Sequence, residues 1–226
     1  MELKKLSERI YISPFEDLRD RPALGYVKGD KYILNIDAGY SLSHVQEYYD
    51  ALKENNLEYP DMTILTHWHW DHSFGLHATK GISIAERRSN EYIKEAMENP
   101  NFEKELKTTN EAFALEFKDQ EMHIEMADIT FDDTIEIDLG NLHAIAFNTI
   151  SPHNDDCVLI YIPEEKVLFV GDAIGGKYPD WSIDPNLNQG LINTIQNLDF
   201  TTAVGSHWPI FTKERLIDDL IHMRLV

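Results

Sequence analysis

The chain has 226 residues, of which 42% are hydrophobic and 11% aromatic, and its formal net charge is −20. This length and composition exclude a disordered chain and are sufficient to bury a substantial core. The strong negative charge repels phosphate backbones, so we expect no nucleic acid partner.

The single cysteine, Cys157, excludes an internal disulfide, and we interpret it as a small buried residue of a strand. Residues 1–20 contain no apolar run long enough for a signal peptide, and the longest apolar runs elsewhere have the length of strands. We therefore expect no membrane partner and a cytoplasmic location.

Short apolar runs in the first third of the chain predict strands. Between two of them, residues 43–56 carry apolar and aromatic side chains at helical spacing, which predicts a helix capped by Ser43. This strand–helix–strand order favours a layered α/β structure. The predicted strands cover residues 9–13, 24–29, 31–40 and 62–66.

Residues 86–120 are charged and periodic with few β-branched side chains, which predicts two helices separated near Asn99 and Pro100. We interpret them as a helical insertion on one face of a single domain that spans residues 1–226. A lid over a site and a plain solvated face are both open interpretations of these helices.

The second half of the chain returns to apolar runs of strand length. Helices are predicted at 185–198 and 213–225. The predicted strands cover residues 129–139, 142–150, 157–162, 166–171 and 202–206.

The stretch from Thr66 to His72 reads THWHWDH and is too rich in histidine for an ordinary core. His67 and His69 follow a predicted strand two residues apart, and residues i and i+2 of an extended chain point the same way. The two imidazoles can therefore bind one ion from one side. Asp71 and His72 come next, where the chain turns toward a helix, and can reach a second ion beside the first.

Three more candidate ligands each follow the end of a predicted strand: His153, Asp172 and His207. In α/β proteins ligands gather beyond the carboxyl ends of strands. Imidazole and carboxylate groups together suit zinc, iron or manganese, and no cysteine is needed. The sequence therefore predicts a metal site built at several strand ends.

The motifs HWHWDH, SPHNDDCVLIYIPEEKVLFVGDAI and GSH resemble those of the metallo-β-lactamase superfamily, and YILNIDAG resembles the first motif of that family. The resemblance covers nearly the whole chain. It implies an α/β fold of the αββα sandwich type with two divalent metal ions at one edge. Zinc is the first expectation for these ions, with manganese or iron as alternatives.

The resemblance also implies a role for each candidate ligand. Asp37 would have the family's structural role beneath the site rather than bind metal. The implied ligands are His67, His69 and His153 for one ion, Asp71, His72 and His207 for the other, and Asp172 as a bridge between the two.

Departures from the family pattern reduce the number of superfamily branches to which the chain can be compared. True zinc β-lactamases have a cysteine at the position of Asp172, and flavodiiron proteins have a glutamate ligand at the position of Trp70. The chain ends soon after His207, without the basic helical domain of glyoxalase II, and Gly175 stands where lactonases have an active-site tyrosine. The pattern favours the branches with the full His/Asp set, which include glyoxalase II-like thioesterases, lactonases and phosphodiesterases.

We therefore expect a metal-dependent hydrolase that acts on a small-molecule ester, thioester or lactone. A small-molecule phosphodiesterase is the alternative, and a non-catalytic metal-binding scaffold is a third hypothesis. Asp71 is the expected catalytic residue, because it would orient the nucleophile and pass its proton to the leaving group.

Four further residues are candidates for a substrate pocket. We expect Trp70 to face the site, whereas strand alternation predicts that Trp68 points away from the metals into the core. The others lie in a loop after the proposed bridge, where specificity residues often occur. They are Lys177, Tyr178 and Trp181, for which an ordinary solvated loop is the other open interpretation.

Overall fold

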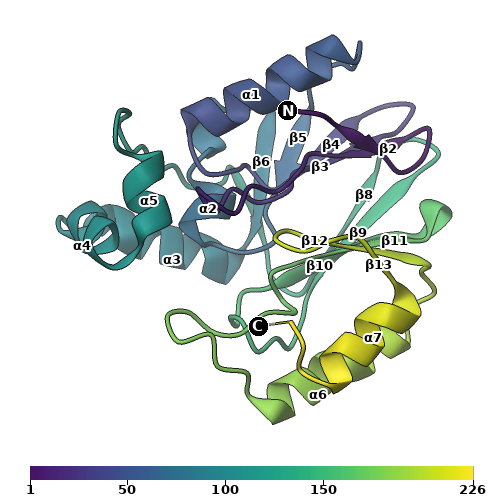
Figure 1. The fold of residues 1–226 in the computed structure, drawn as a ribbon. Helices are drawn as coiled ribbons and strands as arrows, with labels where there is room; N and C mark the ends of the chain where they lie inside the picture. The colour runs from purple at the N-terminus through teal and green to yellow at the C-terminus, as the bar shows by residue number, and fades with distance from the viewer. Residues whose placement is uncertain (226) are drawn as a thin grey trace.

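Two β-sheets pack face to face at the centre of the computed structural model, which describes residues 1–225 (Figure 1). The first sheet has the order β1-β2-β3-β4-β5-β6-β7, antiparallel up to β4 and parallel from β4 to β7. Its strands are β1 (Lys4–Lys5), β2 (Ile10–Ile12), β3 (Gly25–Lys28), β4 (Ile33–Ile36), β5 (Met62–Ile64), β6 (Ile82–Glu86) and β7 (Ile129–Phe131).

The second sheet has the order β13-β12-β11-β10-β9-β8. Only its β11–β12 pair is parallel among the described residues. Its strands are β8 (Thr134–Asp138), β9 (His143–Asn148), β10 (Val158–Ile162), β11 (Val167–Gly171), β12 (Thr202–Gly205) and β13 (Phe211–Thr212).

The main core lies between the two sheets. Aliphatic side chains that alternate along the strands meet there, among them Leu34 and Ile64 from the first sheet and Ile160 and Phe169 from the second. All four are at most 3% exposed, which makes this interface the main hydrophobic contribution to stability.

Helices cover both outer faces. Helix α1 (Leu42–Glu54) packs Val45, Tyr48 and Leu52 against the first sheet. Helices α6 (Pro185–Gln196) and α7 (Lys213–Ile221) cover the second sheet. These layers confirm the predicted αββα sandwich.

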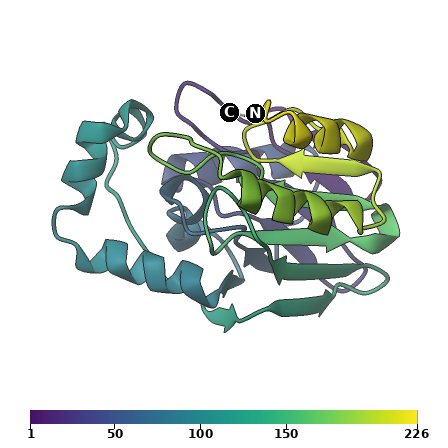
Figure 2. The same cartoon turned by 90° about the horizontal axis from the view of Figure 1, so that it is seen from below.

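The helical insertion is present but contains three helices rather than two. They are α3 (Arg87–Glu98), α4 (Phe102–Thr109) and α5 (Glu111–Glu116). The predicted break near Asn99 is confirmed. A second break occurs at Asn110, whose side chain accepts a hydrogen bond from the backbone N–H of Phe113 and so starts a new helix. Figures 1 and 2 show the three helices at one side of the sandwich.

Three further details differ from the sequence prediction. Helix α1 is capped by Ser41, not Ser43. The run 129–139 forms two strands of different sheets, β7 and β8. Strand β6 was not predicted, although all but its first residue are buried.

Short helical turns complete the chain: α2 (Trp70–Ser73) and the 3₁₀ turns Leu76–Ala78 and Pro163–Glu165. Within residues 1–225 no helix combines the length and apolar character needed to cross a lipid bilayer. The cytoplasmic location and the single-domain boundaries stay predictions.

Candidate metal centre

The ends of four strands bring the candidate ligands to one edge of the sandwich. The chain leaves β5 and passes through His67 and His69 into α2, which carries Asp71 and His72. His153 lies in the β9–β10 connection. Asp172 directly follows β11, and His207 follows β12 by two residues. The seven side chains form two clusters, a first set of His67, His69 and His153 and a second set of Asp71, His72, Asp172 and His207.

The first set is a buried group of three imidazoles. Nε2 of His153 lies 3.2 Å from Nε2 of His67 and 3.0 Å from Nδ1 of His69. Burial first, and the neighbouring imidazoles second, lower the pKa of His69 to about 3 and that of His67 well below its usual value. These rings are therefore neutral at pH 7, which is the form that binds a metal ion.

Hydrogen bonds behind the rings set their orientation. Nδ1 of His153 donates to the carbonyl oxygen of Gly176 at 2.7 Å, which directs the lone pair of Nε2 toward the other two imidazoles. The backbone N–H of Trp68 donates to Oδ2 of Asp156 at 2.8 Å and holds the segment between His67 and His69. The set is thus preorganised by its surroundings.

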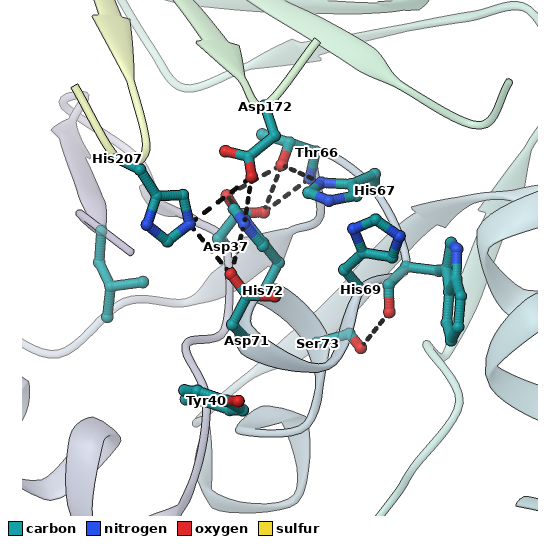
Figure 3. Close-up of polar contacts among 12 residues, drawn as sticks. Asp37, Tyr40, Thr66, His67, His69, Asp71, His72, Ser73, Asp172 and His207 are labelled. Carbon is teal, nitrogen blue, oxygen red and sulfur yellow. Dashed lines mark hydrogen bonds and ion pairs between the residues drawn. The ribbon is translucent and has the colours of Figure 1, made fainter. Parts of the chain in front are cut away.

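The second set combines two imidazoles with two carboxylates (Figure 3). Nε2 of His72 and Nε2 of His207 each lie 3.0 Å from Oδ2 of Asp71. Burial opposes the charged form of His207, but Asp172 and Asp71 outweigh it and raise its pKa to about 9. The second set therefore favours positive charge, either as protons on the rings or as a bound cation.

Asp172 faces both sets. Its Oδ2 atom lies 3.5 Å from Nε2 of His72, 3.6 Å from Nε2 of His207 and 4.0 Å from Nε2 of His153. This position between the two clusters is the one that a bridging ligand would occupy.

Asp37 lies beneath the site. Its carboxylate accepts hydrogen bonds from the backbone N–H of Thr66 at 2.7 Å and from Nδ1 of His72 at 2.8 Å. The second bond leaves Nε2 of His72 free to face the cluster. Asp37 has a φ of +63°, an uncommon backbone conformation for a non-glycine residue, which is held here by these contacts.

Gly171 allows two strand ends to approach each other. Its φ is +53°, and a Cβ atom at this position would lie 2.7 Å from Cβ of Thr66. A larger residue would push apart the chain segments that carry His67 and Asp172.

The polar atoms of the clusters fit a pair of metal ions. Oδ1 of Asp172 is buried and makes no hydrogen bond within the described part of the chain, and Nε2 of His72, although 3.0 Å from Oδ2 of Asp71, is not aligned for a hydrogen bond there. Buried polar atoms without partners are costly, and bound cations would satisfy them. The donor set of imidazole nitrogen and carboxylate oxygen suits zinc, manganese or iron.

The predicted pocket residues all lie beside the clusters. Trp70, Lys177 and Tyr178 line a cavity of about 390 Å³ together with His69 and His153. We call it the larger cavity, to distinguish it from a smaller one beside the second set. Helices α3 and α4 of the insertion form its far wall.

Trp181 lines a second, smaller cavity of about 190 Å³. Its ring also stacks on His153, with ring centroids 6.3 Å apart. Asp71, Asp172 and His207 line the same smaller cavity, which therefore opens on the second set.

The prediction that Trp68 is a core residue was only partly confirmed, since its side chain packs against two clusters of buried residues but also faces a cavity. Trp68 is half-buried and lines the larger cavity, because its ring packs against Trp70 and against Tyr92 and Phe102 of the insertion. Strand alternation did not apply, since β5 ends at Ile64 and the chain is no longer a strand at Trp68.

Sequence reasoning missed Asp20. Its Oδ1 atom lies 3.4 Å from Nδ1 of His207, and it lines the smaller cavity. Burial and the nearby charge of Asp71 raise its pKa to about 6. The segment around Asp20 carries no motif, so only the fold reveals this neighbour.

The remaining histidines lie outside both sets, as expected. His44 accepts a hydrogen bond from the backbone of Tyr40, and His143 pairs with Glu164 at the surface. Cys157 is buried in the core beneath α6 and α7 as predicted, but it directly precedes β10 and is not a residue of the strand.

The sandwich and the clusters at its edge define an αββα protein with a candidate dinuclear metal centre. The sequence profile of the metallo-beta-lactamase superfamily matches residues 25–207, and the chain belongs to this superfamily. No protein with a curated description matches the sequence.

Solved structures of similar fold cover nearly the whole chain. A metallo-beta-lactamase from Pontibacter korlensis is 18% identical over 99% of this chain and 98% of that protein, with a TM-score of 0.73. An archaeal metallo-beta-lactamase superfamily protein from Sulfolobus tokodaii is 18% identical over 96% of this chain and 87% of its own, with a TM-score of 0.65. The sec-alkyl sulfatase PisA1, as a double mutant, is 13% identical over 98% of this chain but only 41% of its own, with a TM-score of 0.76. At these identities the likeness shows the fold alone.

Proposed function

We propose that this protein is a dinuclear metal-dependent hydrolase of a small ester, thioester or lactone. The observation that carries the proposal is the placement of Asp172, whose Oδ2 atom lies within 4.0 Å of imidazole nitrogens from both sets. A carboxylate in this position would be able to bind an ion of each set.

The first set consists of neutral imidazoles and the second set contains two carboxylates, and each set would hold one metal ion. His67, His69 and His153 would hold one ion, and the second set would hold the other through Asp71, His72 and His207 with Asp172 shared. Two divalent ions at such a site supply hydroxide at neutral pH and polarise the oxygen of the substrate.

Asp71 is proposed as the catalytic residue. Its carboxylate lines the smaller cavity and lies against both imidazoles of the second set. From there it can orient the attacking nucleophile and transfer a proton to the leaving group.

Two features favour a carbonyl substrate over a phosphodiester. The net charge of −20 opposes the approach of polyanions. The larger cavity has aromatic walls, and Lys177 is its only lysine or arginine among the described residues. Trp70, Tyr178 and Trp181 would then contact the substrate, and a nucleic acid partner is not proposed.

The proposal is tested with a panel of thioesters, lactones, simple esters, cyclic nucleotides and bis-nitrophenyl phosphate, assayed separately with zinc, manganese and iron. We expect acyl substrates to be turned over best, and turnover to disappear with chelator. A non-catalytic metal-binding scaffold would turn over none of them. Phosphodiester turnover about tenfold above every acyl substrate, or about 1.4 kcal/mol in transition-state stabilisation, would instead establish the phosphodiesterase alternative.

A further inference from the structure

The larger cavity has apolar walls from two separate parts of the chain. Trp68, Trp70 and Tyr178 come from the loops at the metal edge, and Tyr92, Phe102 and Leu106 come from α3 and α4. Its volume of about 390 Å³ lies in the range of small-molecule sites, which is about 300–1,000 Å³.

The aromatic walls support one another. The ring centroids of Trp70 and Tyr178 lie 5.1 Å apart at 80°, and those of Trp68 and Tyr92 lie 5.7 Å apart. Rings packed in this way lose little conformational freedom when a ligand binds, so the cavity is a preformed apolar site.

The rim of this cavity offers little net charge. Glu105 and Lys177 both line it, with opposite charges. Lys177 forms no ion pair within residues 1–225, so its ammonium is available to a polar atom of a ligand. The aromatic walls, in contrast, suit an uncharged apolar group.

The two cavities meet at the metal edge and differ in polarity. His69 and Trp70 line both, so a single substrate can extend from one cavity into the other. Asp20, Asp71, Asp172 and His207 line only the smaller cavity, whereas the larger cavity has aromatic walls. An apolar acyl group therefore fits the larger cavity, and the more polar leaving-group side of the substrate fits the smaller one.

We infer that the larger cavity is an acyl-binding pocket, and that the substrate is an acyclic ester or thioester with a medium-length alkyl or arylalkyl acyl group. The inference rests on the proposed function. In the reaction, water adds its oxygen to the acyl carbon, and the bond from that carbon to the leaving oxygen or sulfur breaks. The proton lost by water goes to the leaving group, which yields a carboxylic acid and an alcohol or thiol.

Two neighbouring threonines of α4 offer a matched test. Thr108 and Thr109 are both exposed, and each hydroxyl donates to the carbonyl oxygen four residues earlier. Only Thr109 lines the larger cavity. Thr109→Trp therefore fills the cavity from its rim, whereas Thr108→Trp adds the same side chain outside it.

The metal-loaded protein and both variants are assayed with p-nitrophenyl acetate, butyrate, hexanoate and octanoate, and with the matching S-acyl thioesters of N-acetylcysteamine. Each buried methylene contributes up to about fourfold in kcat/KM, so we expect octanoate to exceed acetate by about tenfold or more. Thr109→Trp should lose this preference, so that octanoate no longer exceeds acetate by tenfold, whereas Thr108→Trp should keep both the preference and the wild-type rates. Comparison of the two series shows whether the ester or the thioester is the better substrate.

Binding of a ketone that cannot be hydrolysed gives a second readout. We expect 2-nonanone to quench the tryptophan fluorescence of the metal-loaded wild type and of Thr108→Trp saturably, and to bind Thr109→Trp about tenfold more weakly. Acetone, which lacks the alkyl chain, should bind to the wild type and to both variants far more weakly than 2-nonanone binds to the wild type.

The outcomes separate the inference from the proposed function. Ester turnover without chain-length dependence, or equal behaviour of the two tryptophan variants, would overturn the acyl pocket alone. Absence of turnover with every substrate of the wider panel would overturn the proposed function, and this inference with it.

Discussion

Arg21 and Glu116 form a buried ion pair between segments 95 residues apart in the chain. Nε of Arg21 donates to Oε2 of Glu116 at 2.9 Å, and Nη2 donates to Oε1 at 3.0 Å. The two side chains are 3% and 1% exposed. Since Arg21 follows Asp20 directly, the pair ties the segment beside the candidate metal centre to α5 of the insertion.

Loss of this pair should destabilise the fold. Glu116→Gln leaves a buried guanidinium whose remaining carboxylate partners, Glu47 at 2.9 Å and Glu16 at 3.9 Å, are both half-exposed, so we expect a loss of about 3 kcal/mol in the free energy of unfolding. Urea unfolding of the variant and the wild type in the presence of chelator measures this difference.

An exposed ion pair provides the control. Arg87 and Asp132 lie 2.6 Å apart but are 51% and 69% exposed, and Asp132→Asn should change stability by less than about 1 kcal/mol. Replacing both buried partners, as Arg21→Met with Glu116→Leu, should recover most of the loss. Equal effects of Glu116→Gln and Asp132→Asn would show that burial of the Arg21 pair has no energetic consequence.

Asp156 should make stability depend on pH. Burial raises the pKa of its carboxyl to about 7, despite the hydrogen bonds from Ser89 and Trp68 that favour the ionised form. In the unfolded chain the pKa is about 3.9, so between about pH 4 and pH 7 the folded state binds more protons than the unfolded state. The free energy of unfolding therefore falls as the pH rises through this window, by up to about 4 kcal/mol.

Asp156→Asn should remove this decline. Both Ser89 and Trp68 donate to Oδ2 of Asp156, and Oδ1 has no partner within residues 1–225, so an asparagine oxygen can accept both bonds. We expect the variant to gain stability over the wild type as the pH rises from 4 to 8, measured by urea unfolding with chelator present. Asp155→Asn, at the exposed neighbouring position, should keep the wild-type slope. Parallel curves for wild type and Asp156→Asn would refute the assignment.

Asp172→Ala should affect metal binding more than folding. Its removal leaves the second set with one carboxylate and takes away the oxygen shared between the sets, so we expect metal content to fall from about two ions per chain to about one. The melting temperature in chelator should change by no more than about 4 °C, which corresponds to about 1 kcal/mol. Asp180→Ala, in the exposed loop that follows, is the control. Two tightly bound ions in the Asp172→Ala protein would exclude Asp172 as the bridge.

The positions of the ligands were predictable because strands and their ends are local features. Alternating or continuous apolar runs located β5, β9, β11 and β12, and the polar residues that follow each run lie together at one edge of the sandwich. Spacing alone assigned His67 and His69 to one ion and Asp71 and His72 to a second, and the resemblance to a family added the assignment of His153, Asp172 and His207 to these two sets.

Features that depend on distant contacts were not predictable. The run 129–139 has the pattern of one long strand, but the turn at Asp132 and Asp133 sends its halves into different sheets. Asp20 reaches His207 only because the chain folds back, and Trp68 meets the insertion through the packing of Tyr92 in α3 and Phe102 in α4. Local sequence patterns carry no information on such pairings.

Metal content tests the central claim most directly. We predict that elemental analysis of protein purified without chelator finds about two transition-metal ions per chain, because two buried sets of imidazole and carboxylate donors share Asp172. The double variant His67→Ala with His69→Ala should lose the ion of the first set, and His143→Ala, at a surface histidine outside both sets, should retain both ions. Reproducible absence of metal from the wild type, or metal content unchanged in the double variant, would contradict the assignment of these clusters as a dinuclear centre.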